Sequence, residues 1–277
     1  MRRWFLVCVV VVVTAAAGNL AAAEKSSETT QGKAPPKTLP LSGEVFLVGR
    51  CTAFLIPPRH SFAKEATPWV WYAPTLRGLP ADTEKWMFER FTAAGIAIAG
   101  IDVGESYGSP SGRSQYTALY RTLVDKRGMS PKPVLLGRSR GGLMLYAWAC
   151  ENADKVAAIA GIYPVCNIAS YPGIGRAAGA YQLTADELKG ELRNHNPLDR
   201  LESLAKARVP LFAIHGDADV VVPLAQNSGE MAKRYAALGG KMELIVPKGQ
   251  GHNMWRGFFE CQELVDFVIK HARAGDN

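Results

Sequence analysis

Apolar and polar positions alternate along this chain in a pattern that predicts a β-sheet covered by helices. Continuous apolar runs, typical of buried strands, occur at residues 69–73, 96–101, 134–137, 156–162, 211–216 and 242–247. Segments with apolar residues at helical spacing lie at 82–95, 114–128, 141–153, 224–240 and 258–272. Two earlier runs, 44–48 and 52–56, predict a hairpin or bent strand pair. Because buried strands alternate with helices, the predicted class is α/β, with a mostly parallel central sheet and helices on both faces.

Residues 163–209 interrupt this alternation. They contain no clear strand, and their composition predicts loops and short helices. In open α/β sheets, ligands bind beyond the carboxyl ends of the strands. We therefore expect 163–209 to be an insertion that acts as a lid over the site.

The first 40 residues predict export rather than folded structure. A basic start, a short apolar run and the small residues of "AAAE" are typical of a secretory signal peptide over 1–23, cleaved after Ala23. The alternative is an uncleaved membrane anchor, although the apolar run is shorter than the roughly 20 residues that a spanning helix needs. Residues 24–40 are polar and predict a disordered linker. The predicted domain is 41–277, in a secreted or periplasmic protein.

Charge and cysteine content narrow the function classes. The net charge of +7 falls to +5 once Arg2 and Arg3 leave with the signal peptide, and the remaining basic residues are spread out. We therefore expect no nucleic-acid partner and, after cleavage, no membrane partner. No cluster has metal-ligand spacing, so neither a metal nor a cofactor is predicted. The four cysteines of the mature chain allow three complete disulfide pairings, among which sequence does not choose: Cys51, Cys150, Cys166 and Cys261.

The stretch "GRSRG" at 137–141 carries the first chemical signal. It lies between a predicted strand and a predicted helix, the context in which G-x-S-x-G forms a nucleophile elbow. The turn is sharp, and a side chain at Gly137 or Gly141 would collide with the adjoining strand and helix. Ser139 is the predicted nucleophile, and the backbone N–H of Arg140 is predicted to bind the oxyanion.

A serine hydroxyl needs a base that is itself oriented by an acid. In α/β-hydrolases these follow in the order Ser, Asp or Glu, His. "HGDADVVVP" supplies Asp217 and Asp219 after one strand, and "GQGHNMW" supplies His252 after the next. Each follows the carboxyl end of a predicted strand, the same edge as Ser139.

With these motifs the chain resembles the prolyl-oligopeptidase-like and esterase group of α/β-hydrolases, over residues 44–272. "HGDADVVVP" is similar to the family block H-G-x-x-D-x-x-V-P, and that resemblance assigns the triad acid to Asp219 and a loop-organising role to Asp217. "PWVWYA", "GRSRGG" and "PVC" resemble exported bacterial carbohydrate esterases. Many relatives have His-Gly after the strand that ends here in "YAPTL". Pro74 has no N–H, so Thr75 is the predicted second oxyanion donor, with Leu76 as the alternative.

The substrate side is predicted from arginines and aromatic residues. Arg138 and Arg140 flank the nucleophile; they either pair with carboxylates such as Asp102 or Glu105, or bind an acidic group of the substrate. Four aromatic side chains are placed where they would stack on sugar rings, although ordinary packing is the alternative for each: Trp71, Tyr107, Tyr171 and Trp255.

Together these features predict an exported serine hydrolase that cleaves a carboxylic ester, on a small molecule or on a neutral or acidic polysaccharide. The resemblance also admits a small serine peptidase, although the family's peptidases generally carry a large propeller domain. A third alternative is an inactive hydrolase scaffold used for binding. The oligomeric state is not predicted.

Overall fold

The apolar runs form one sheet in the computed structural model, which describes residue 1, residues 35–60 and residues 66–274. Within this part of the chain the sheet has eight strands, in the order β1-β2-β4-β3-β5-β6-β7-β8. Their bounds are β1 Glu44–Val48, β2 Cys51–Ile56, β3 Trp69–Tyr72, β4 Ala97–Ile101, β5 Val134–Arg138, β6 Ala158–Ile162, β7 Leu211–Ile214 and β8 Met242–Ile245. Strands β3 to β8 are parallel, whereas β2 is antiparallel to β1 and to β4.

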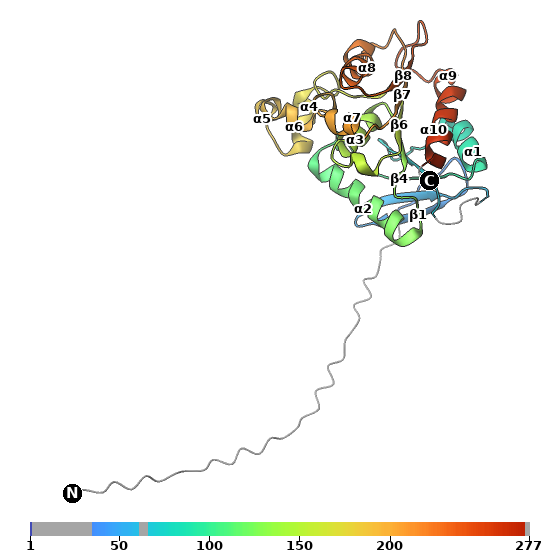
Figure 1. Cartoon of the computed structure of the whole chain (residues 1–277), viewed down its shortest axis with the longest axis horizontal. Helices are drawn as coiled ribbons and strands as arrows, with labels where there is room; N and C mark the ends of the chain where they lie inside the picture. Colours follow the sequence, from blue (N-terminus) through green and yellow to red (C-terminus); the bar gives the residue numbers. More distant parts are fainter. Residues whose placement is uncertain (2–34, 61–65, 275–277) are drawn as a thin grey trace. The chain divides into compact units, whose positions relative to one another are not determined.

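Helices cover both faces of the sheet, and Figure 1 shows the sheet between them. One face packs against α2 (Pro110–Arg127), α3 (Arg140–Ala149) and α8 (Ser228–Ala237). The other face packs against α1 (Lys85–Ala93), α9 (Arg256–Phe259) and α10 (Gln262–Ala274). Successive residues of a strand point to opposite faces, so Trp69 and Trp71 enter the first core and Val70 and Tyr72 the second. Both faces are apolar, as the continuous runs predict.

Helix ends differ from the prediction where local capping decides them. Helix α2 begins at Pro110 rather than 114, because Ser109 caps it by accepting a hydrogen bond from the Gly112 N–H and proline suits the first turn. The predicted helix 258–272 is two helices, α9 and α10. The predicted helix 224–240 is a short 3₁₀ turn, Leu224–Gln226, followed by α8.

The insertion 163–209 has the short helices that its composition predicts. They are α4 Ile174–Tyr181, α5 Ala185–Gly190, α6 Leu192–His195, the 3₁₀ turn Pro197–Asp199 and α7 Glu202–Lys206. Apolar residues of α4 and α5 pack with Leu143 of α3 in a small separate core. The Tyr181 hydroxyl donates to the backbone oxygen of Tyr107 at 2.8 Å, which fastens α4 to the loop after β4.

The predicted signal peptide and most of the predicted linker, residues 2–34, lie outside the described residues. The end of the linker, 35–40, does not have the disorder that we predicted. Lys37 donates to the Asp102 carboxylate at 2.9 Å and to the backbone oxygen of Arg77 at 3.1 Å, and only 2% of its side chain is exposed. A long-range ion pair therefore anchors this segment. In the ranges the structure covers, no helix combines the length and hydropathy needed to cross a bilayer.

The four cysteines of the described chain are free thiols, so none of the three complete disulfide pairings forms. Burial raises the pKa of Cys150 to about 12 and that of Cys261 to about 11. Because the thiolate is the reactive form, these two thiols are chemically inert at neutral pH.

Candidate active site

Ser139 lies between β5 and α3 in a strained backbone conformation, with φ 50° and ψ −123°. A positive φ is costly for a non-glycine residue and is typical of a nucleophile elbow. The neighbouring glycines permit the turn. A Cβ at Gly137 would lie 2.6 Å from Gly142 Cα, and one at Gly141 would lie 2.8 Å from the Ala73 oxygen. The collisions predicted from "GRSRG" are therefore present on both sides of the serine.

The structure brings the three predicted triad residues together from separate loops. Ser139 Oγ lies 2.9 Å from His252 Nε2, and His252 Nδ1 lies 2.8 Å from Asp219 Oδ2. Ser139 follows β5, Asp219 follows β7 and His252 follows β8, so all three lie at the carboxyl edge of the sheet. This arrangement can move the serine proton to the imidazole while the carboxylate holds the ring.

The Asp219 carboxylate is buried but well supplied with donors. Oδ1 accepts the backbone N–H groups of Val221 and Val222 at 3.0 and 2.8 Å, and Oδ2 lies 3.3 Å from His215 Nε2. Burial acts to raise the pKa of Asp219, but the hydrogen bonds from His215, His252 and Val222 outweigh it, and the pKa lies well below its usual range. Asp219 is therefore ionised throughout the working pH range. Asp217 has the other role predicted for it: its carboxylate accepts the Gly249 N–H at 2.6 Å, in the loop that carries His252.

The two predicted oxyanion donors, the backbone N–H groups of Arg140 and Thr75, lie in segments that are close together in space. Arg140 is the first residue of α3, so its N–H belongs to the first turn, whose donors have no partner within the helix. The Thr75 N–H has no hydrogen-bond acceptor among the described residues. A Cβ built on Gly141, in the first turn of α3, would lie 3.7 Å from Thr75 Cγ2. The chemistry needs two free N–H groups near the nucleophile, and Arg140 and Thr75 remain the predicted pair.

Both arginines that flank Ser139 are paired within the protein. The Arg140 guanidinium pairs with Glu105, one of the two carboxylates considered from sequence. Arg138 pairs with neither: its Nη1 donates to Glu84 Oε1 at 2.8 Å, and Asp102 is occupied by Lys37. Pairing within the protein, one of the two alternatives weighed from sequence, is therefore what the structure shows for Arg138, although with Glu84 as the carboxylate, and a substrate-binding role for Arg138 stays a prediction.

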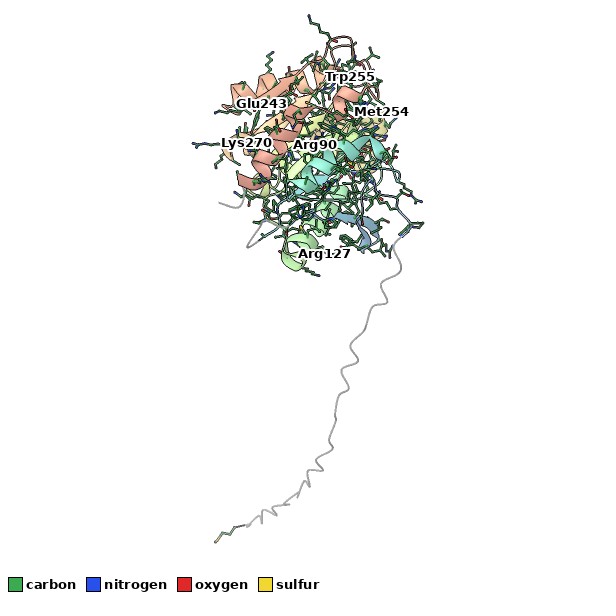
Figure 2. All side chains as sticks on the ribbon, turned by 90° about the vertical axis from the view of Figure 1, so that its right-hand side faces the viewer. Arg90, Arg127, Glu243, Met254, Trp255 and Lys270 are labelled. Atoms are coloured by element: carbon green, nitrogen blue, oxygen red, sulfur yellow. The ribbon has the colours of Figure 1, made fainter. Side chains whose placement is uncertain are left out.

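The aromatic candidates separate into buried and exposed residues. Trp71 is fully buried and packs on Trp69 and Trp148, so its predicted role in stacking on a sugar is wrong. Tyr107 is 8% exposed and packs beneath α4, which leaves it little surface for a substrate. Trp255 is 41% exposed, three residues beyond His252, and Figure 2 shows it beside Met254. Trp255 is exposed enough to reach a ligand, and its role in stacking on a sugar stays a prediction.

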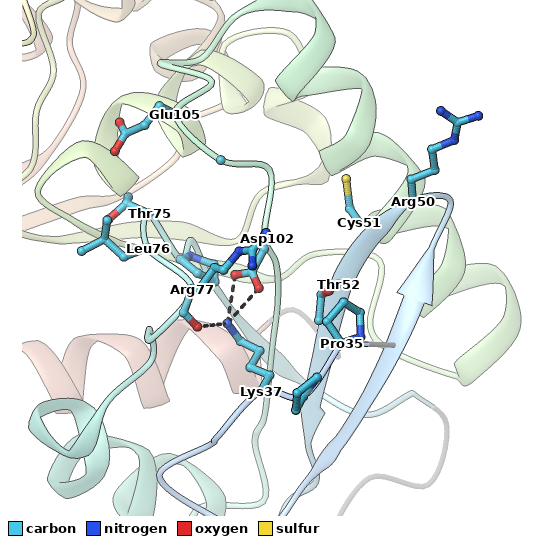
Figure 3. A pocket seen from close by; sticks show the side chains of 13 residues that line it. Pro35, Lys37, Arg50, Cys51, Thr52, Thr75, Leu76, Arg77, Asp102 and Glu105 are labelled. Atoms are coloured by element: carbon cyan, nitrogen blue, oxygen red, sulfur yellow. Dashed lines mark hydrogen bonds and ion pairs between the residues drawn. The ribbon is translucent and has the colours of Figure 1, made fainter. Parts of the chain in front are cut away.

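A cavity of about 530 Å³ opens beside the elbow, at the turn that carries Thr75. Its lining includes Thr75, Leu76 and Glu105, the partner of Arg140. Figure 3 shows Lys37 and Asp102 joined in its wall. Three strand ends form the cavity: the carboxyl ends of β3 and β4, and the amino end of the reversed strand β2.

Three residues around the site were missed from sequence: Glu84, Tyr163 and His215. Glu84 stands near the start of an amphipathic helix and looks like a solvated acid, yet it is fully buried. The ring centroid of Tyr163 lies 4.4 Å from that of His252. His215 bridges Ser228 Oγ and the Val222 oxygen at 2.8 Å each, and its Nε2 lies 3.3 Å from Oδ2 of the triad acid. Its place two residues before Asp217, at a strand end, was the available signal.

Comparisons with solved structures confirm the predicted α/β-hydrolase fold. Est1E from Butyrivibrio proteoclasticus has 18% identity and a TM-score of 0.64, and the match covers 84% of this chain and all of that one. A truncated carbohydrate esterase from gut microbiota has 17% identity and a TM-score of 0.61, over 80% and 90% of the two chains. A puromycin-hydrolysing peptidase of Mycobacterium tuberculosis has 18% identity and a TM-score of 0.65, over 87% of this chain. This chain spans 40% of that peptidase.

The sequence comparisons agree with the geometry of the site. No curated protein gives a significant match. The prolyl oligopeptidase family matches residues 114–273, more than half of the chain, and the matched segment contains Ser139, Asp219 and His252. The chain therefore belongs to the prolyl oligopeptidase family of serine hydrolases.

Proposed function

We propose that the protein is an exported serine hydrolase that cleaves a carboxylic ester on a polysaccharide. The observation that carries the proposal is the continuous hydrogen-bonded series from Ser139 through His252 to Asp219, at 2.9 and 2.8 Å. The proposal of export rests on the signal-peptide pattern of residues 1–23. If it is correct, protein exported by a bacterial host begins at Glu24 on N-terminal sequencing.

The chemistry follows from the geometry. His252 Nε2 takes the proton of Ser139 as Oγ attacks the ester carbonyl, and the ionised Asp219 stabilises the imidazolium that forms. The N–H groups of Arg140 and Thr75 would hold the oxyanion of the tetrahedral intermediate. Collapse of this intermediate passes the proton to the departing alcohol and leaves an acyl-serine. Water, activated by the same imidazole, then releases the acid.

The cavity beside Thr75 supports a sugar substrate. Arg50 and Arg77 line it, and neither forms an ion pair among the described residues, whereas Lys37 and Glu105 are paired. Arg77 interacts electrostatically with Asp102, and the Arg50 side chain extends away from it on the far side of the cavity (Figure 3). Each guanidinium group suits a uronate carboxylate, which it binds in a planar geometry. Arg138 and Arg140 are paired within the protein, so we propose that Arg50 and Arg77 bind the carboxylate of an acidic sugar. The similarity to Est1E and to a carbohydrate esterase supports an ester substrate.

The second candidate is a serine peptidase. It is favoured by the prolyl oligopeptidase match and by the peptidases among the similar structures. An amide needs the same nucleophile, base and oxyanion donors as an ester. Substrate assays are therefore the means of separating the two functions.

The test is a screen of the purified chain on acetylated xylan, methylated pectin and feruloylated arabinoxylan, with released acetate, methanol or ferulate as the readout. Aminoacyl p-nitroanilides form the peptidase arm. We expect release from at least one polysaccharide, and its loss in Ser139→Ala. Turnover of anilides alone would establish the peptidase. If neither arm shows turnover that depends on Ser139, the result would favour the third alternative, an inactive hydrolase scaffold used for binding.

The acidic-sugar preference has its own test. Replacing Arg50 or Arg77 by glutamine should raise the KM for a uronate ester about tenfold and leave a neutral ester unchanged, because a charge-assisted hydrogen bond contributes about 1.5–3 kcal/mol. Arg121→Gln, on the exposed surface of α2, is the matched control. Equal changes for charged and neutral esters would contradict the preference.

A further inference from the structure

A buried ion pair lies directly behind the nucleophile. Arg138, the last residue of β5, precedes Ser139, and its Nη1 donates to Glu84 Oε1 at 2.8 Å. The Glu84 side chain is fully buried, and 17% of the Arg138 side chain is exposed. Glu84 also accepts the Tyr72 hydroxyl at 3.0 Å and the Ala81 N–H at 2.9 Å. The carboxylate is therefore fixed from several directions, and it fixes the guanidinium in turn.

Besides Glu84, the Arg138 guanidinium contacts residues that surround His252. Arg138 Nη2 lies 2.9 Å from the sulfur of Met254, two residues beyond His252, and Arg138 Cζ lies 5.0 Å from the ring centroid of Phe259. Tyr163 interacts with the Arg138 guanidinium and packs on the His252 ring, with 4.4 Å between the two ring centroids. Arg138 thus contacts the loop that carries the base and the residue that packs on the base.

The charges around His252 come from several elements. The loop after β7 contributes the Asp219 carboxylate, with His215 beside it, and Asp217 binds the loop after β8 at Gly249. The ends of β5 and β6 contribute Arg138 and the Tyr163 phenol, and the 3₁₀ turn before α1 contributes Glu84. Beyond the loop after β8, Arg256 of α9 pairs with Glu260. Among these, Arg138 and Glu84 form a neutral couple, so each masks the charge of the other toward the imidazole.

We propose that Arg138 and Glu84 are positioning residues that hold the His252 loop and keep the electrostatic field at the imidazole neutral. The proposal rests on the proposed function, in which His252 is the base. Arg138 acts through Met254, Tyr163 and its own charge, and Glu84 acts by fixing Arg138 and through its own charge. Removing one member leaves the other as an unmasked charge in a poorly solvated place, where charges interact over several ångströms.

The two single variants should therefore shift the titration of His252 in opposite directions. In Arg138→Gln, unmasked Glu84 favours the imidazolium, so the acid limb of the kcat/KM profile moves up by about 0.5–1 pH unit. In Glu84→Gln, unmasked Arg138 disfavours the imidazolium, and the limb moves down by a similar amount. The double variant should return the limb to the wild-type position with a lower kcat. A purely structural role would lower activity without opposite shifts.

The assay is kcat/KM for p-nitrophenyl acetate from pH 4 to 9, with Arg234→Gln in an exposed ion pair of α8 as the control. Arg138→Lys keeps the charge, and we expect the wild-type limb with reduced kcat from it. NMR titration of the His252 ring in a Ser139→Ala background measures the same shifts without turnover, so a failed esterase assay does not decide the matter. Shifts in the same direction, or no shift in folded variants, would overturn the proposal.

Discussion

Replacing Asp219 by asparagine tests the catalytic arrangement at a single atom. Asp219 Oδ1 accepts two backbone N–H groups, from Val221 and Val222, so the asparagine carbonyl oxygen will occupy that position. Its amide nitrogen then replaces Oδ2, 2.8 Å from His252 Nδ1. A donor there requires Nδ1 to be an acceptor and leaves the ring proton on Nε2. That nitrogen faces Ser139 Oγ and can no longer take its proton.

The size of the effect follows from the loss of the correct tautomer. An equivalent change in a serine protease lowers kcat about 10⁴-fold, which corresponds to about 5 kcal/mol of transition-state stabilisation. We expect the same for Asp219→Asn in p-nitrophenyl acetate hydrolysis. Asp217→Asn is the matched control, since an asparagine oxygen can still accept the Gly249 N–H, and it should lose less than about tenfold. Equal losses in the two variants would refute the assignment.

The same substitution has a consequence for stability. The pKa of Asp219 is lower in the folded than in the unfolded chain, whose Asp pKa is about 3.9. Ionised Asp219 therefore stabilises the folded state at any pH above about 3.9, and this stabilisation is lost as the pH falls from there through the folded pKa. The stability deficit of Asp219→Asn should therefore be largest near neutral pH and shrink in acid. Urea unfolding at pH 7 and pH 3 measures it; a deficit independent of pH would argue against the lowered pKa.

The remaining predictions concern backbone space and a buried charge. Gly137→Ala places a methyl group 2.6 Å from Gly142 Cα, and this overpacking should lower the free energy of unfolding by about 2 kcal/mol or more. An unchanged urea midpoint would mean that the backbone of the elbow can move to accommodate the methyl group. Lys37→Met leaves the partly buried Asp102 unpaired, and it should cost up to about 3 kcal/mol, most of it recovered in Lys37→Met/Asp102→Leu. Thermal unfolding measures both Lys37 variants, and no recovery in the double variant would contradict the pairing.

Local pattern was enough to predict Ser139 and His252 from sequence, whereas the choice of Asp219 over Asp217 came from the resemblance of "HGDADVVVP" to the family block. Each triad residue follows an apolar run that forms a strand: Ser139 follows β5, Asp219 follows β7 and His252 follows β8. Parallel strands have their carboxyl ends at one edge of the sheet, which brings the three residues to the same edge. The fold class depends on the same runs. Long-range pairing has no such signal: Lys37 lies in a polar segment, and its partner Asp102 is 65 residues away.

The burial of Trp71 and the partner of Arg138 were missed from sequence for two different physical reasons. Both faces of the sheet are buried, so strand β3 has no alternation of polar and apolar residues to tell which face a side chain enters. Trp71 therefore looked available to a ligand. The partner of Arg138 was hidden for a different reason, because Glu84 begins an amphipathic helix in which acids normally face water. Only the packing of α1 on the sheet places that carboxylate behind the serine.

The reversed direction of β2 has a consequence for how selectivity can change. Since β2 is antiparallel to its neighbours, the turn before it, at Gly49 and Arg50, reaches the edge of the sheet where the cavity opens. A tight turn between two strands tolerates insertion and substitution far better than a buried core does. If the cavity binds the sugar, as we propose, variation in ligand preference can accumulate in this hairpin while the elbow and the acid and base loops stay unchanged.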